Sequence, residues 1–179
     1  MTNEPMSTSG PHEALLRDEA RTVVSALHMQ HWTGLVRLAV LTMGDRQAAE
    51  DVVQEAFATL YRQWPLKEEG VELGYLRAAV LYRSRSVLRR RRVARMYTPP
   101  YQAPKASAES DVVLSEERGE VQRALQGLPA RTREVLVLRF YLDLPFGEIA
   151  ALLGIREASA RSTASRRLVM LTNRLKGLR

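Results

Sequence analysis

Apolar residues recur at helical spacing along residues 45–64, and this pattern constrains the fold more than any other feature of the sequence. They lie three and four positions apart, at Ala49, Val52, Val53, Ala56, Phe57, Leu60, Tyr61 and Trp64, which is the pattern of an amphipathic helix. Asp45 is suited to cap the start of this helix, and Pro65 to end it. No bounded segment of the chain sustains the alternation that is typical of a half-buried strand. The sequence therefore predicts an all-α fold.

Helical patterns fall into two blocks, separated by a stretch with a different composition. Residues 98–115, "TPPYQAPKASAESDVVLS", contain three prolines and many small polar residues without periodicity, which indicates a flexible linker. Residues 1–12 are polar and carry turn-forming residues, so we expect a disordered N-terminus. Two small helical domains are predicted on either side of the linker, at residues 13–97 and 116–179.

Residues 75–97, "YLRAAVLYRSRSVLRRRRVARMY", contain eight arginines and no acid. Apolar residues predicted to face the core recur through the segment, at Leu76, Ala79, Val80, Val87 and Leu88. We therefore expect a helix whose arginines point outward. The whole chain has a net charge of +7 and a pI of about 10.2. This balance favours a polyanionic partner, which is more often nucleic acid than a membrane surface.

The composition excludes several classes of protein. The chain has no cysteine, so disulfides, thiolate metal sites and thiol catalysis are ruled out. No apolar run approaches the length that spans a bilayer, and the first twenty residues contain acids and lack the apolar region of a signal peptide. We expect a cytoplasmic protein without membrane insertion.

Catalytic and metal-binding patterns are missing from the sequence. It has no phosphate-binding loop, no nucleophile elbow and no convincing acid–base pair, so we expect neither an enzyme nor a bound cofactor. His28 and His31 have metal-ligand spacing, but no third ligand accompanies them. Packing or surface exposure is favoured over a metal site.

The C-terminal segment "GEIAALLGIREASARSTASRRLVML", residues 147–171, matches the pattern of a helix-turn-helix. A short helix would turn three residues inward, at Ile149, Ala150 and Leu153, and Gly154 would take positive φ at the turn. A second helix would begin near Glu157 with Leu168 and Leu171 on its inner side. Its predicted outer face carries Ser159, Arg161, Ser162, Ser165 and Arg166. Such a helix suits the major groove of DNA, although a basic surface helix in an ordinary bundle has the same pattern.

On these residues the C-terminal half resembles region 4 of bacterial sigma factors. The segment "HMQHWTGLVRLAVLTMGDRQAAEDVVQEAFATLYRQW", and within it "DVVQEAF", is similar to sigma region 2. Two helical domains with no domain between them resemble the compact extracytoplasmic-function (ECF) group. The resemblance covers about residues 13–175.

The resemblance implies that the helix with "DVVQEAF" docks on the clamp helices of RNA polymerase. The solvent-facing residues implied in this contact are Glu50, Asp51, Gln54 and Glu55. They form a local acidic surface on a basic protein. The alternative is that these acids only keep the helix soluble.

The arginine-rich segment aligns with the part of region 2 that melts and holds the −10 promoter element. The arginines implied in phosphate contacts are Arg83, Arg85, Arg89, Arg90 and Arg92. Unstacked bases would lie on Tyr75, Tyr82 and Tyr97, although packing against the core is the alternative for each ring. Tyr82 stands where related sequences usually carry an asparagine. The −35 element would be contacted by Ser159, Arg161, Ser162, Ser165 and Arg166.

The function implied is that of an alternative sigma factor, which binds core RNA polymerase and directs initiation at particular promoters. Its implied partners are core RNA polymerase, promoter DNA and an anti-sigma protein. Two alternatives remain from the residues alone. One is a helix-turn-helix regulator that acts without joining polymerase, and the other is a basic nucleoid or RNA-binding protein without sequence preference.

Overall fold

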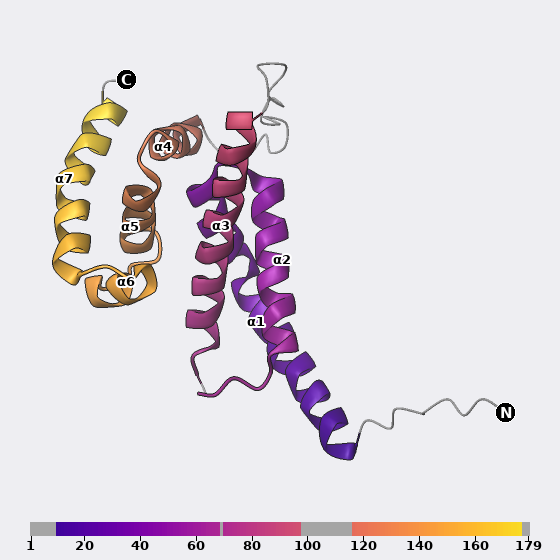
Figure 1. Cartoon of the computed structure of the whole chain (residues 1–179). Helices are drawn as coiled ribbons and strands as arrows, with labels where there is room; N and C mark the ends of the chain where they lie inside the picture. The colour runs from indigo at the N-terminus through magenta and orange to yellow at the C-terminus, as the bar shows by residue number, and fades with distance from the viewer. Residues whose placement is uncertain (1–9, 69, 98–115, 177–179) are drawn as a thin grey trace.

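The computed structural model describes residues 10–68, 70–97 and 116–176, and every regular element within these ranges is a helix (Figure 1). The helices are α1 (Pro11–Met43), α2 (Arg46–Arg62), α3 (Glu72–Tyr97), α4 (Glu116–Gln126), α5 (Ala130–Phe140), α6 (Phe146–Leu153) and α7 (Glu157–Lys176). The predicted all-α fold is confirmed. The predicted linker at residues 98–115 lies outside the described residues, as do residues 1–9 of the predicted N-terminal segment. Helix α1 begins two residues before the expected domain boundary.

Helices α1, α2 and α3 pack side by side, and the first two meet at a corner of two residues (Figure 1). Gly44 ends α1 in the left-handed conformation, with φ of 78°, and its N–H donates to the Val40 carbonyl. Asp45 then caps α2, because its Oδ1 accepts a hydrogen bond from the Ala48 N–H at 3.0 Å. The predicted cap is therefore confirmed. Helix α2 ends at Arg62, two residues before the expected end.

The predicted apolar face of α2 forms the centre of the N-terminal bundle. The buried residues of this helix are Ala49, Val52, Val53, Ala56, Phe57 and Leu60. From α3 they meet Leu76, Val80 and Leu81, which are at most 1% exposed. Each fully buried valine or leucine contributes about 1.5–3 kcal/mol through removal from water. This packing fixes α2 and α3 against each other and decides which of their charged residues face outward.

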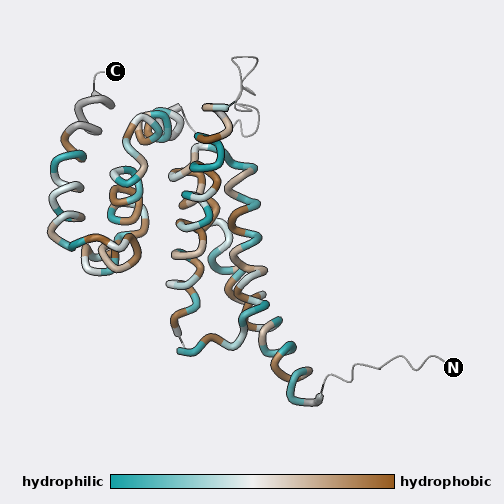
Figure 2. Tube along the Cα trace, viewed as in Figure 1, coloured by the Kyte–Doolittle hydropathy of each residue, from teal (hydrophilic) through white to brown (hydrophobic). Residues whose placement is uncertain are grey.

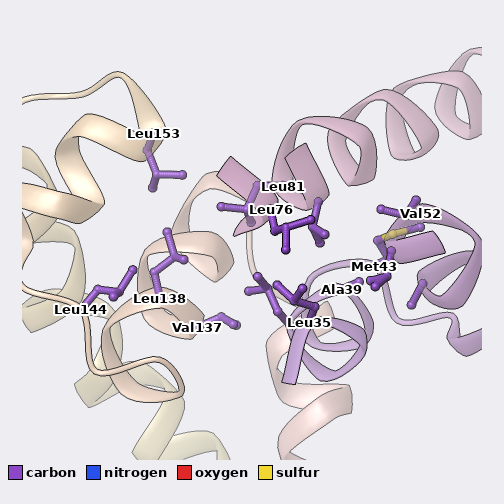
Figure 3. Close-up of a cluster of buried hydrophobic side chains, with 14 of the residues drawn as sticks. Leu35, Ala39, Met43, Val52, Leu76, Leu81, Val137, Leu138, Leu144 and Leu153 are labelled. Atoms are coloured by element: carbon purple, nitrogen blue, oxygen red, sulfur yellow. The ribbon is translucent and has the colours of Figure 1, made fainter. Parts of the chain in front are cut away.

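Helix α5 lies between the N-terminal bundle and the helix-turn-helix, and its whole middle is buried. All residues from Thr132 to Leu138 are buried, and these include the charged Arg133 and Glu134. Figure 3 shows Val137 and Leu138 between the leucines of the C-terminal half and those of α1 and α3. A run of four consecutive apolar residues covers all sides of a helix, which suits a helix with neighbours on both sides. The two halves therefore share one hydrophobic core.

None of the described helices is long and apolar enough to cross a bilayer, and hydrophilic residues interrupt each of them along its length (Figure 2).

Candidate nucleic-acid interface

Six arginines of α3 form an exposed group and a half-buried group. Arg89, Arg90 and Arg92 are exposed near the C-terminal end of the helix. Arg83, Arg85 and Arg91 are half-buried and bind acids or hydroxyls of neighbouring helices. The exposed group is a concentrated positive surface, and phosphates are the natural ligands of such a surface.

The expectation that all the arginines of α3 face outward is wrong for the half-buried group. Arg83 donates to Thr59 Oγ1 at 2.7 Å and lies 3.7 Å from the carboxylate of Glu55. Arg91 Nη2 lies 2.8 Å from Asp45 Oδ2. An arginine side chain is long enough to leave its own helix and reach an acid on the next one, which the apolar spacing of α3 does not reveal.

Arg85 makes the most extensive of these contacts, and it crosses from one half of the protein to the other. Its Nε and Nη2 donate to the two carboxylate oxygens of Glu134 on α5, at 2.6 and 2.9 Å. The Glu134 side chain is 3% exposed, and Arg131 approaches it at 3.3 Å. This paired arrangement is the geometry in which arginine binds carboxylates and phosphates most strongly.

The three tyrosines expected to stack on bases differ in their surroundings. Tyr82 is 70% exposed on the outer side of α3, and Tyr97 is 84% exposed at its end. Tyr75 packs against the core, and its hydroxyl donates to Gln63 Oε1 at 2.7 Å. The rings of Tyr82 and Tyr97 are therefore open to solvent, whereas the Tyr75 ring is held by the bundle.

The acidic surface of α2 is partly neutralised by the helix itself. Glu50 pairs with Arg46 at 2.9 Å, and Glu55 pairs with Arg62 at 2.8 Å. The hydrogen bond from Arg62 holds the pKa of Glu55 below its ordinary value, with smaller contributions from Arg62 and Arg83 as charges. Asp51 and Gln54 are exposed, and Asp51 accepts a hydrogen bond from the side chain of Gln47 at 3.4 Å. A partner that binds these two side chains would have to displace few contacts within the protein.

The helix-turn-helix has the predicted geometry at its turn. Ile149, Ala150 and Leu153 of α6 are buried, and Gly154 takes φ of 62°. Helix α7 begins at Glu157 as expected. An added Cβ on Gly154 would meet nothing within 4 Å, so the left-handed backbone is the reason for glycine here.

The inner face of α7 differs from the expected one. Leu168 is 38% exposed, whereas Ala160 and Ala164 are 0% and 2% exposed. Leu171 lies among the residues of α7 whose side chains are outside the description. The prediction for Leu168 is wrong because alanines one turn apart make the contact, and their small side chains let α7 approach α5 and α6 closely.

The outer face of α7 carries the residues expected at the −35 element. Ser159, Arg161, Ser165 and Arg166 are exposed, and Ser162 is half-buried. Arg161 pairs with Glu157 at 2.6 Å and lies over the ring of Phe146, 5.2 Å from its centroid. These contacts hold the guanidinium in a defined orientation, and Phe146 was not among the residues singled out from the sequence.

A polar hollow of about 300 Å³ lies beside this face, lined by Thr132, Thr163, Arg166 and Arg167. Arg166 also donates to the hydroxyl of Ser162. The two arginines and two hydroxyl groups make the hollow a surface suited to an anion such as a backbone phosphate.

Arg133 of α5 and Gln126 of the preceding helix α4 tie the two halves together, and the sequence analysis singled out neither residue. Arg133 donates to the Thr42 carbonyl at the end of α1, to the Leu128 carbonyl and to the Gln126 side chain. Gln126 Nε2 donates to the Leu41 carbonyl at 3.1 Å. Burial lowers the pKa of Arg133 from its ordinary value, and the neighbouring Glu134 carboxylate opposes that shift. The sequence marked Arg133 only as a charged residue close to the apolar run at residues 135–138.

His28, which was weighed as a metal ligand, stacks on Trp32 with ring centroids 4.6 Å apart. Within residues 10–68, 70–97 and 116–176, no three histidine, aspartate or glutamate side chains gather in a way that would hold a metal ion.

Comparison with known proteins gives a match to the family described as Sigma-70, region 4, over residues 118–171. The chain is 30% identical over 142 residues to the ECF RNA polymerase sigma factor SigE of Mycolicibacterium smegmatis. That match covers 76% of this chain and 55% of the relative, so the chain spans little more than half of that protein's length. It is 27% identical over 142 residues to the RNA polymerase sigma-E factor of Streptomyces coelicolor, covering 79% of each.

Among solved structures, the fold is similar to the sigma factor RpoE of Bartonella quintana, crystallised with the anti-sigma factor NepR. The TM-score is 0.64 at 21% identity, and the match covers 86% of this chain and 94% of RpoE. The likeness extends over helices of both halves.

Proposed function

Because this chain belongs to the extracytoplasmic-function group of RNA polymerase sigma factors, we propose that it binds core RNA polymerase and directs the enzyme to particular promoters. Sigma factors are transcription initiation factors and not enzymes, so RNA synthesis belongs to the polymerase. The observation that supports the proposal best is the separation of charge between adjacent helices. Exposed acidic and amide groups lie on α2, and exposed arginines lie on α3.

Three polar surfaces, on α2, α3 and α7, would each bind a different partner. Clamp helices of polymerase would bind α2, and the residues assigned to this contact are Glu50, Asp51, Gln54 and Glu55. The −10 element would bind α3, through Tyr82, Arg83, Arg85, Arg89, Arg90 and Arg92, with Tyr75 supporting from the core. The −35 element would bind α7, through Ser159, Arg161, Ser162, Ser165 and Arg166. The exposure of Asp51, Arg90 and Arg161 supports these assignments.

An anti-sigma protein is the further partner we assign to this chain, by analogy with the RpoE–NepR complex. Polymerase and promoter DNA are cytoplasmic in bacteria, so the proposed activity places the chain in the cytoplasm.

The proposal is tested by run-off transcription with core polymerase on genomic fragments. Core polymerase with this protein should start RNA at discrete sites that core polymerase alone ignores. Diffuse initiation that is equal with and without the protein would refute the proposal. Sequence-dependent duplex binding without any binding to polymerase would instead identify a regulator of the helix-turn-helix class.

The polymerase contact is tested separately with Asp51→Lys. Asp51 is exposed and its described contact is the weak one from Gln47, so the reversal of charge should leave α2 intact. Glu55→Lys is a poorer choice, because it would place a third cation beside Arg62 and Arg83. Binding to core polymerase should weaken about tenfold or more, which corresponds to about 1.4 kcal/mol.

The matched control for this variant is Glu68→Lys, which makes the same change of charge in the exposed loop after α2. It should bind core polymerase like the parent. Equal binding by the Asp51→Lys protein and the parent in a pull-down, with unchanged circular dichroism, would remove α2 from the polymerase interface.

A further inference from the structure

The ion pair between Arg85 and Glu134 joins the two halves of the protein, to which the proposed function gives separate roles. Arg85 is one of the α3 arginines assigned above to the −10 element, and Glu134 belongs to α5 of the helix-turn-helix half, which lies beside α3 in Figure 1. We propose that Glu134 occupies on Arg85 the position of a DNA phosphate, so that closure of the two halves and DNA binding by α3 exclude each other. This inference rests on the proposed role of α3 in holding promoter DNA.

The geometry of the contact supports substitution of one anion for the other. Glu134 accepts from Arg85 Nε at 2.6 Å and from Nη2 at 2.9 Å, which is the two-point contact that arginine also makes with a phosphate. Nε and Nη2 form one of the two edges through which a guanidinium donates a pair of hydrogen bonds, and Glu134 occupies this edge. While Glu134 holds it, a phosphate cannot take the same two hydrogen bonds.

Solvent exclusion makes the contact more than a chance surface pair. The Glu134 side chain is 3% exposed and the Arg85 side chain is 33% exposed. An exposed pair of this kind is weak because water screens it, whereas a carboxylate buried at a domain boundary depends on its cation. Separation of the halves would return both groups to water, and Arg85 would then be ready for DNA.

Other contacts hold the same boundary together without involving the arginines of α3. Arg133 and Gln126 donate to the carbonyls of Thr42 and Leu41 in the last turn of α1. Those carbonyls lack helical partners, and a cation is favourable at the C-terminal end of a helix. Apolar packing of Val137 against the N-terminal bundle adds to them (Figure 3). Glu134 is therefore the member of this boundary that couples closure to DNA.

The test measures closure and DNA binding on the full chain without polymerase. Because the chain has no cysteine, dyes attached to a Met29→Cys, Ala151→Cys double variant report the separation of α1 from α6 by energy transfer. Both positions are exposed and lie outside the proposed binding surfaces. The probe is a short single-stranded DNA of mixed sequence, since phosphate contacts do not depend on sequence.

Adding DNA to the labelled parent should lower energy transfer as the halves separate. Glu134→Gln should lower it without DNA and should tighten DNA binding at least about fivefold, the change expected when a boundary loses 1 kcal/mol. The matched control is Glu148→Gln, an exposed acid of α6 that loses the same charge. It should leave energy transfer unchanged and affect DNA binding much less.

A second variant separates this contact from a general effect of charge. Arg85→Ala should also open the halves, and adding Glu134→Gln to it should change neither energy transfer nor DNA affinity further. Persistence of the full effect of Glu134→Gln without Arg85 would overturn the inference. The inference would also be overturned if the labelled parent became saturated with DNA while its energy transfer stayed unchanged.

Failure of this inference and failure of the proposed function can be told apart. If run-off transcription fails while the energy-transfer results hold, the contact controls another kind of DNA-binding protein. If transcription is promoter-specific but Glu134→Gln behaves like Glu148→Gln, the sigma assignment stands and the inference falls.

Discussion

Replacing Asp45 tests how the corner between α1 and α2 is stabilised, because this residue makes two separable contacts. Its side chain caps α2 through the Ala48 N–H at 3.0 Å, and it pairs with Arg91 of α3 at 2.8 Å. Loss of an aspartate cap costs about 1 kcal/mol. The ion pair is more than a third exposed on the arginine side, so we assign it only about 0.5 kcal/mol.

Asp45→Ala should therefore lower the free energy of unfolding by about 1.5 kcal/mol, or the melting temperature by about 3–6 °C for a chain of this length. Asp45→Asn should lose only about 0.5 kcal/mol, because asparagine caps helices as well as aspartate but carries no charge. Urea denaturation followed by helical circular dichroism measures both values. Equal losses for the two variants would refute the assignment of most of the stabilisation to the cap.

The same residue gives a pH dependence with a definite sign. The hydrogen bond from Ala48 lowers the pKa of Asp45 from its ordinary 3.8, and Arg91 lowers it further. A carboxyl whose pKa is depressed on folding stabilises the protein above its unfolded pKa, and the contribution is lost as pH falls through the folded pKa. The difference in stability between the parent and Asp45→Asn should thus be constant near neutral pH and shrink below about pH 4. A difference that grows on acidification would contradict this reasoning.

Four further substitutions have expected outcomes. Ser84→Ala should keep or raise stability by up to about 1 kcal/mol in urea denaturation, because the buried Ser84 hydroxyl has no hydrogen-bond partner among the described residues. Leu138→Ala should cost about 2–5 kcal/mol in the same assay, since this side chain is 0% exposed in the shared core. Gly154→Ala should cost about 1–2 kcal/mol from its left-handed backbone alone, and a larger loss would point to a clash that the open surroundings do not show. If Arg161 contacts a base, Arg161→Ala should lose about 1–3 kcal/mol of discrimination between −35 sequences in competition binding. If it contacts a phosphate, the affinity should fall equally for all sequences, and the slope of log affinity against log salt concentration should be smaller by about one.

Local sequence patterns predicted the local structure of this chain well. The spacing of apolar residues and the cap at Asp45 located α2, and Gly154 located the turn of the helix-turn-helix. These features depend on neighbours within about one or two helical turns, which a sequence pattern records directly. The failure at Leu168 has the same origin, because the pattern alone ranks a leucine above Ala164 as a core residue.

Contacts between distant segments could not be predicted in the same way. Arg85 and Glu134 are separated by 49 positions. The residues next to an arginine in the sequence do not record whether a distant acid reaches it in the fold or whether its side chain stays in water. Nothing in the sequence of α3 distinguishes Arg85 from Arg89, yet one is half-buried and the other exposed. The apolar run at residues 135–138 lies in a helix whose whole middle is buried, and nothing in the local sequence says which helices cover it.

The shared helix α5 limits how freely this protein's halves can be recombined with those of its relatives. A C-terminal half transplanted onto another N-terminal half keeps Glu134. The new host must then supply an arginine at the position of Arg85 and open carbonyls in the last turn of its α1, where Thr42 lies here. A chimera lacking them would either bury an uncompensated carboxylate or leave the apolar side of α5 in water. Successful exchanges should therefore carry α1, α3 and α5 together. The part that can be exchanged is the N-terminal bundle with the helix that docks on it, and not a single domain.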